Sequence, residues 1–171
     1  MGAGATRKQP GFRLSILKSP AGCGSRTGLS MKYCFPDINV WVALAYRGHQ
    51  HHPAAASWFN QLTETAGFCR VTQLGFLRLI THPTIMGDDV LSQKEAWKSY
   101  DKLAADSRVT FYFEPDELED QLRLLTASSQ SNAQQWPDAY LAAFARSADL
   151  TLVTFDRALA KLAAPNALLL H

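Results

Sequence analysis

The sequence lacks the features that mark several classes of protein. No run of about 18 apolar residues is present, which excludes a membrane-spanning helix. Its 3 cysteines form no CxxC pair and are too few for a disulfide framework. We therefore expect a protein of a reducing compartment, the cytoplasm, with no membrane partner.

Acidic residues are absent from residues 1–30, where Arg and Lys occur 5 times among many glycines and serines. The whole chain has 17 basic and 15 acidic residues, so residues 31–171 keep 12 and 15, a net charge of −3. The overall charge of +2 therefore gives no indication that the folded part binds nucleic acid. We expect residues 1–30 to be a basic, disordered tail or to precede the true start at Met31; a basic arm that touches RNA or a partner is the alternative.

Residues 31–171 have the pattern of one globular domain, in which short apolar runs alternate with helical periodicity. A capping box of Ser92 and Glu95 opens one helix, in which Trp97 and Tyr100 are predicted to face inward. The alternation predicts an α/β fold, a three-layer α/β/α sandwich with a mainly parallel central sheet. We expect strands at about 32–36, 68–71, 109–113, 150–153 and 167–170, and helices at about 38–46, 53–65, 73–80, 92–105, from 115, 137–149 and from 157.

Carboxylates occur at three places where a parallel sheet would form a site. Asp37 follows the first strand, Asp156 follows the strand at about 150–153, and Asp138 lies in the first turn of a helix. Three such carboxylates would repel one another unless a divalent cation such as Mg²⁺ or Mn²⁺ bound them. Such an ion can activate water and polarise a phosphoryl oxygen. Each Asp also suits a helix N-terminus, and spacing alone leaves both interpretations open.

Three segments resemble a known family, and their order and separation fit it across about residues 31–170. The segment Asp37-Ile38-Asn39-Val40 resembles the D-x-N start of PIN domains, Asp138–Ala143 their D-A-x-L-A-A helix, and Leu152–Arg157 their closing T-x-D segment. Two further stretches are similar to VapC toxins of type II toxin–antitoxin systems. These stretches are Val71–Leu79 and His52–Phe59.

The resemblance implies a Mg²⁺- or Mn²⁺-dependent endoribonuclease that hydrolyses phosphodiester bonds of RNA such as tRNA or rRNA. It implies that a cognate VapB-like antitoxin inhibits the toxin and that the toxin forms a homodimer. The residues to which it assigns metal binding and catalysis are Asp37, Asp138 and Asp156. The supporting residues that we expect are Asn39, Gln73 and Thr154, and the expected RNA contacts are Arg78 and Arg157.

Gln73 departs from the family pattern, since many PIN domains carry Glu at this position. A neutral amide can bind a metal or its water through the carbonyl oxygen, but it adds no charge. Either three acids suffice here, or metal binding is weaker, or another acid such as Glu95 substitutes. Gln73 and the negative domain charge also leave open a catalytically weak or inactive PIN-fold module that binds RNA or protein. A PIN nuclease of RNA maturation or DNA repair is a further alternative.

Overall fold

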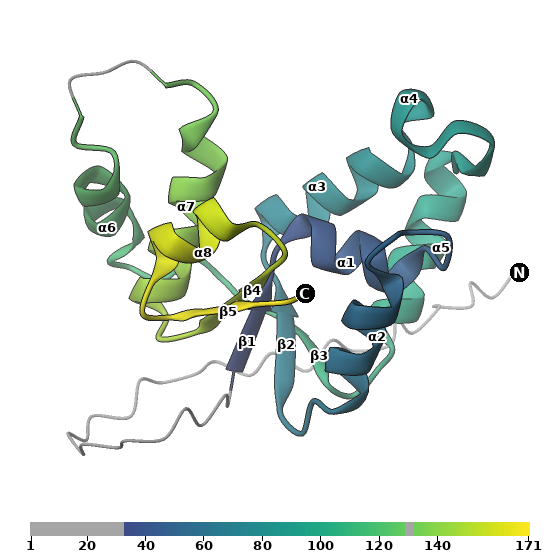
Figure 1. The fold of residues 1–171 in the computed structure, drawn as a ribbon, viewed down its shortest axis with the longest axis horizontal. Helices are drawn as coiled ribbons and strands as arrows, with labels where there is room; N and C mark the ends of the chain where they lie inside the picture. Colours follow the sequence, from purple (N-terminus) through teal and green to yellow (C-terminus); the bar gives the residue numbers. More distant parts are fainter. Residues whose placement is uncertain (1–32, 129–131) are drawn as a thin grey trace, which may run out of the picture.

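The structure is a computed structural model that describes residues 33–128 and 132–171 (Figure 1). The prediction of a basic tail at residues 1–30 lies outside the described residues and stays a prediction. No helix among the described residues is long and apolar enough to cross a membrane.

The described residues form a five-stranded, all-parallel sheet with the strand order β3-β2-β1-β4-β5. Phe35 pairs with Leu152 across β1 and β4, and Cys34 pairs with Ala66 across β1 and β2. The central strands are buried on both faces, as is usual for a parallel sheet covered by helices. The strands are β1 (Tyr33–Pro36), β2 (Thr65–Phe68), β3 (Val109–Phe111), β4 (Thr151–Thr154) and β5 (Ala167–Leu169).

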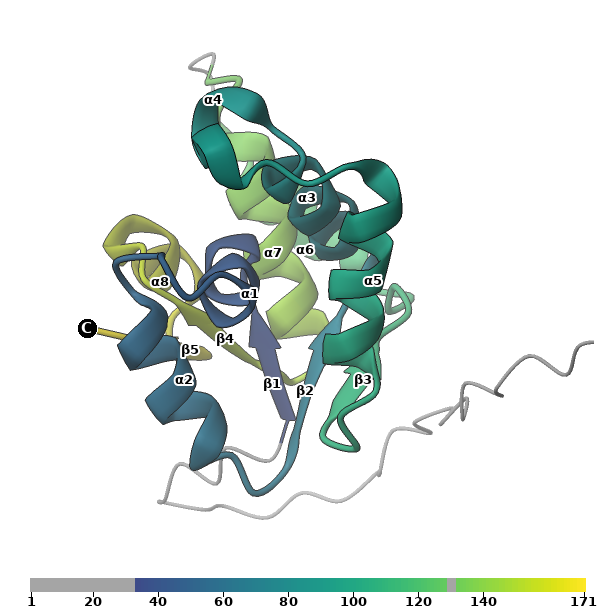
Figure 2. The ribbon, with the colours of Figure 1, turned by 90° about the vertical axis from the view of Figure 1, so that its right-hand side faces the viewer.

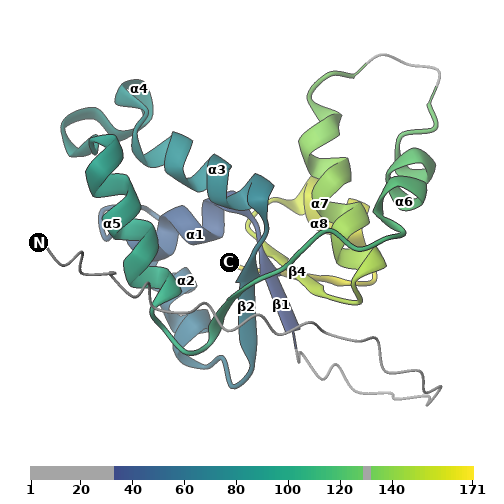
Figure 3. The same ribbon diagram turned by 180° about the vertical axis from the view of Figure 1, so that it is seen from behind.

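Helices cover both faces of the sheet and complete three layers (Figures 1 and 3). One face carries α1 (Ile38–Ala45), α2 (His52–Asn60), α3 (Arg70–Ile80) and α5 (Gln93–Ala104). The other face carries α6 (Leu118–Leu125), α7 (Gln135–Ser147) and α8 (Arg157–Ala163). The predicted three-layer α/β/α fold is therefore confirmed.

The core is divided by the sheet into two apolar clusters. In the first, Trp41 stacks on Phe68 with ring centroids 3.8 Å apart. In the second, Phe35 stacks on Phe144 at 4.8 Å. Between α3 and α5, the short helix α4 (Pro83–Met86) and the 3₁₀ helix η1 (Gly87–Asp89) lie at one end of the molecule, away from the strands (Figure 2).

Three local predictions were wrong. The helix expected at about 53–65 ends at Asn60, and Thr65 begins β2. The strand expected at 68–71 ends at Phe68, because Cys69 is the N-cap of α3 and its backbone N–H donates to Thr72 Oγ1 at 2.9 Å. This capping box turns an apolar, strand-like segment into the start of a helix. Trp97 was expected inside but is 48% exposed, because Ala96 and Tyr100 occupy the inward face of α5.

Candidate functional site

The site lies where the strand order reverses. From β1 the chain passes to β2 and β3 on one side, whereas β4 and β5 lie on the other side of β1. The segments that follow β1 and β4 therefore diverge at the carboxyl edge of the sheet, which is where ligands bind in open α/β sheets. Asp37 follows β1 directly, and Asp156 lies two residues beyond the end of β4.

Asp37 is buried, and hydrogen bonds engage both of its carboxylate oxygens and its backbone N–H. Its Oδ1 accepts from the backbone N–H of Val40 at 2.8 Å, which caps α1, and its Oδ2 accepts from the Thr154 hydroxyl. Its own N–H donates to the Val153 carbonyl at 2.9 Å. Burial raises the pKa of Asp37 to about 6, and repulsion from Asp156 adds to this rise, while the hydrogen bonds oppose it.

Thr154 links the Asp37 carboxylate to the backbone of Asp156. Its buried hydroxyl donates to Asp37 and accepts from the backbone N–H of Asp156 at 2.9 Å. Asp156 Oδ1 caps α8 by accepting from Ala158 N at 2.6 Å and from Leu159 N at 3.1 Å. The capping interpretation of Asp37 and Asp156 is therefore correct, but in Asp156 it uses one carboxylate oxygen and leaves Oδ2 for another ligand.

Asp138 reaches the same region from α7. This helix leads into the start of β4 at the opposite edge, so its first turn lies at the carboxyl edge of the sheet (Figure 1). The Asp138 side chain is half-buried and makes no hydrogen bond to a described residue. Its pKa is raised by burial and by repulsion from Asp156. Asp156 thus repels both Asp37 and Asp138, which indicates that the three carboxylates face one region.

The donor set fits an open magnesium site better than a closed cluster. No three Asp, Glu, His or Cys side chains of the described residues lie close enough together to form a ready metal cluster. Mg²⁺, however, keeps several waters and often needs only one or two carboxylates. Asp37 and Asp156 could provide these, and none of the three Asp residues is paired with a cation among the described residues.

The supporting residues separate into two groups. Thr154 is the bridge described above, and Asn39 contributes its backbone N–H to Asp37 while its side chain is exposed. Gln73 is directed elsewhere, since its Oε1 accepts a hydrogen bond from Arg70 and its side chain lies beside Tyr100. Glu95 does not take its place, because its carboxylate is exposed and bonded to Ser92 Oγ and N, the latter at 2.9 Å.

The two arginines expected to contact RNA differ in position. Arg157 is exposed at the start of α8, next to Asp156. Arg78 is exposed in the last turn of α3, at the end of that helix away from β2. Arg70, at the opposite end of α3, lies at the carboxyl edge of the sheet, as Arg157 does.

Replacing Thr154 by Val should lower the free energy of unfolding by about 1–3 kcal/mol, because it leaves a buried carboxylate and a backbone N–H without their partner. It should also raise the pKa of Asp37 further. Urea unfolding at neutral pH and NMR titration of the carboxyl carbons measure the two effects. Thr151→Val, at the other end of β4, is the matched control, since its hydroxyl makes no hydrogen bond to a described residue. A Thr154 variant as stable as the control variant would contradict the bridging role.

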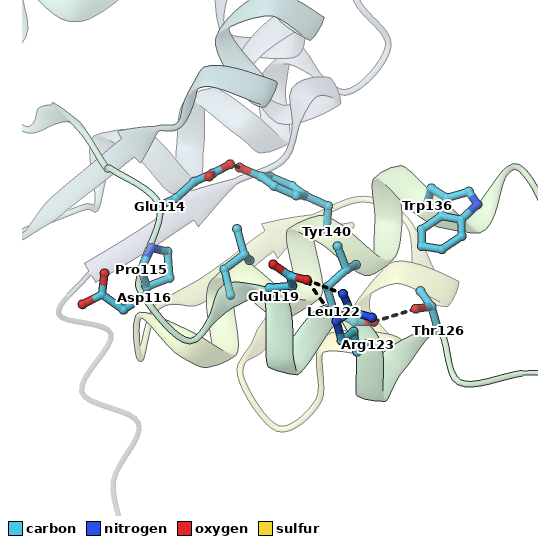
Figure 4. A pocket seen from close by; sticks show the side chains of 10 residues that line it. Glu114, Pro115, Asp116, Glu119, Leu122, Arg123, Thr126, Trp136 and Tyr140 are labelled. Carbon is cyan, nitrogen blue, oxygen red and sulfur yellow. Dashed lines mark hydrogen bonds and ion pairs between the residues drawn. The ribbon is translucent and has the colours of Figure 1, made fainter.

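A pocket of about 820 Å³ lies between α6, α7 and the segment after β3 (Figure 4). Within it, Tyr140 donates to Glu114 Oε1 at 2.7 Å and Glu119 pairs with Arg123. Its wall includes Trp136, which is 57% exposed. None of the three Asp residues lines this pocket, so it is separate from the carboxylate site.

Known proteins are similar to this chain in sequence and in fold. The family model of the PIN domain matches residues 34–165. Ribonuclease VapC41 of Mycobacterium tuberculosis is 40% identical over 128 residues, which cover 71% of this chain and 88% of the relative. The chain belongs to the VapC family of PIN-domain ribonucleases. A second VapC relative from the same organism, ribonuclease VapC39, is 31% identical over 130 residues, covering 72% of this chain and 88% of the relative.

Solved structures of VapC proteins show the same fold. VapBC2 from Rickettsia felis, bound to a DNA fragment from its promoter, aligns with a TM-score of 0.60 and 12% identity over 81% of this chain and 99% of that one. VapC20 of Mycobacterium tuberculosis, a sarcin–ricin loop cleaving toxin, aligns with a TM-score of 0.53 and 14% identity over 71% and 87%. At these identities the likeness concerns the fold alone.

Proposed function

We propose that this chain is the toxin of a toxin–antitoxin system and a Mg²⁺- or Mn²⁺-dependent endoribonuclease that hydrolyses phosphodiester bonds of RNA. The observation that carries the proposal is the placement of Asp37, Asp138 and Asp156 around the switch point of a VapC-family PIN domain. The names of its ribonuclease VapC relatives support the same activity.

In this proposal the chain's own residues hold and orient the reacting groups. A bound divalent ion would supply positive charge that stabilises the phosphoryl group and acidifies water. Asp37 and Asp156 would hold that ion, because both are fixed at strand ends and have no competing cation. The Thr154 hydroxyl keeps Asp37 Oδ2 in one orientation, and Asp138 faces them from α7 as a third acceptor for water or the ion.

The partners follow from the family and remain part of the proposal. We expect a VapB-like antitoxin, a structured RNA such as tRNA or rRNA as substrate, a homodimer and a cytoplasmic site of action. The fold shared with VapBC2 supports the antitoxin. Expression of the chain should arrest bacterial growth, and co-expression of a small adjacent reading frame should relieve the arrest.

The direct test is cleavage of total RNA by the purified full chain. We expect products with 5′-phosphate and 3′-hydroxyl ends in the presence of Mg²⁺, no cleavage with excess EDTA, and recovery on addition of Mn²⁺. Cleavage that ignores EDTA would rule out the metal-dependent mechanism. If calorimetry detects neither Mg²⁺ nor Mn²⁺ binding while RNA still binds, the alternative of a non-catalytic RNA-binding module is correct.

A further inference from the structure

We propose that Arg70 and Phe113 form a nucleotide-binding subsite beside the carboxylates, in which Arg70 binds a phosphate and Phe113 stacks on a base. In this subsite Gln73 is a positioning residue that holds Arg70 without cancelling its charge. The inference rests on the proposed function and extends it to how the RNA is held. It also gives a physical role to the residue that departs from the family pattern.

The side chain of Gln73 contacts residues other than the three carboxylates of the candidate site. Its side chain is 4% exposed, its Oε1 accepts from Arg70 Nη1, and it lies beside the buried Tyr100 on α5. The hydrogen-bond partners of Asp37 are Val40, Asn39 and Thr154, and Gln73 is not among them.

Arg70 is held in place without being neutralised. Gln73 binds one guanidinium nitrogen, and the guanidinium carbon lies 5.1 Å from the centre of the Phe111 ring. Among the described residues, Arg70 pairs with no carboxylate. An arginine fixed by an amide and an aromatic face keeps its other N–H groups for a ligand, and its planar fork suits the two oxygens of a phosphate.

The position of Arg70 suits an RNA chain that passes over the carboxylates. Cys34 pairs with Ala66, so the residues after β1 and β2, Asp37 and Cys69, lie at the same level on neighbouring strands, and Arg70 comes next. Neighbouring strands are about 4.8 Å apart. A phosphate at Arg70 would therefore belong to a nucleotide near the bond to be cleaved.

Phe113 supplies the second element of the subsite. It follows β3 at the same sheet edge, is 65% exposed, and its ring lies 5.6 Å from that of Phe111, which underlies Arg70. A cation beside an exposed aromatic ring is the combination with which proteins hold single-stranded RNA. A protein segment such as part of an antitoxin would also cover an aromatic ring, but it would not require an unneutralised cation next to a metal-binding edge.

The neutrality of Gln73 follows from this arrangement. A Glu at position 73 would form an ion pair with Arg70 and remove the positive charge that a phosphate needs. Residues 31–171 have a net charge of −3, so fixed cations near the carboxylates are valuable for binding an anionic substrate. Gln73 preserves the hydrogen bond and leaves the charge of Arg70 available.

The test measures binding of a fluorescent single-stranded RNA by anisotropy, in EDTA, to the full chain made inactive by Asp37→Asn. In this parent, Arg70→Gln should weaken binding about 10-fold and reduce the slope of log K against log salt by about 0.7. Gln73→Glu should weaken binding to a similar extent, and should add nothing once Arg70→Gln is present. Phe113→Ala should weaken binding about 10-fold without changing the salt slope.

Lys102→Gln is the matched control, because it removes one positive charge from the last turn of α5, which leads toward the amino edge of β3. It should change binding by less than about twofold. Thermal unfolding of each variant shows that it is folded; Arg70 and Phe113 are exposed, so their variants stay informative if Gln73→Glu is unstable.

Calorimetric titration of Mg²⁺ into the chain that keeps Asp37 tests the competing interpretation, in which Gln73 is a weakened metal ligand. We expect Gln73→Glu to bind Mg²⁺ as the native chain does; tighter binding together with faster RNA cleavage would show a weakened metal ligand and overturn the inference. It is also overturned if Arg70→Gln and Phe113→Ala bind RNA like the parent, or if they lose only an antitoxin. A parent that binds no RNA at all would instead overturn the proposed function, and this inference with it.

Discussion

Replacing Asp37 by asparagine should reduce RNA cleavage at least about 100-fold, the upper end of the effect of losing a residue that merely supports a metal ligand. Asparagine is as good an N-cap as aspartate, so Oδ1 can still accept from Val40 and the start of α1 is kept. What the variant lacks is the negative charge between β1 and β4. A loss of this size in a folded protein would therefore be assigned to the charge.

The measurement is the initial rate of RNA cleavage at saturating Mg²⁺, with circular dichroism and thermal unfolding to show that both proteins are folded. Asp149→Asn is the control: Asp149 is exposed just before β4, at the other edge of the sheet, and its φ of 50° suits Asn. The control should cleave RNA at the native rate. Equal rates for Asp37→Asn and the native chain would mean that Asp37 is only a helix cap.

The sequence predicted the fold class because the patterns that indicate it are local. Apolar runs of strand length alternate with helical patterns, and Asp37, Asp138 and Asp156 each stand next to such a boundary. The boundary at Cys69 was missed because a cysteine is an unusual N-cap, and the hydrogen bond from its backbone to Thr72 outweighs the strand propensity of the segment.

Features that depend on distant parts of the chain were beyond sequence reasoning. The strand order, which brings β1 next to β4, decides that Asp37 and Asp156 flank the switch point. Thr154 and Asp37 are separated by 117 residues, yet they share a hydrogen bond. The side chain of Gln73 on α3 lies beside Tyr100 on α5, so its direction could not be read from a motif. The placement of these side chains follows from tertiary packing and not from spacing along the chain.

Helix capping by an Asp side chain is compatible with metal binding by the same side chain, although the sequence presented the two as alternative interpretations. A carboxylate has two oxygens, and Asp156 uses only Oδ1 to cap α8. Asp37 uses both, for Val40 and for Thr154, yet each carboxylate oxygen can accept more than one bond. Caps at the strand ends thus fix the carboxylates in place, which a preorganised ligand set requires.

The stability of the metal-free protein should depend on pH through Asp37. Its pKa is about 6 in the folded chain and 3.8 as an ordinary value, so the folded state binds the proton more tightly than the unfolded state does. The stability that this proton provides is fully present below about 3.8 and is lost as the pH rises to about 6. The difference between the two pKa values corresponds to about 3 kcal/mol in the free energy of unfolding. This conversion needs no reduction for solvent screening, because the side chain is almost fully buried.

Asp37→Asn should therefore be more stable than the native chain at pH 7.5 in EDTA, by up to about 3 kcal/mol, and the gap should shrink toward pH 4.5. Urea unfolding of the two proteins at a series of pH values measures the gap, and comparing the pair cancels the titration of all other groups. Saturating Mg²⁺ should close the gap at pH 7.5, because an ion that binds only the folded state stabilises it, and it should do so mainly in the native chain. If the gap is independent of pH, burial of Asp37 does not disfavour its ionised form. If Mg²⁺ stabilises both proteins equally, the ion binds elsewhere than at Asp37.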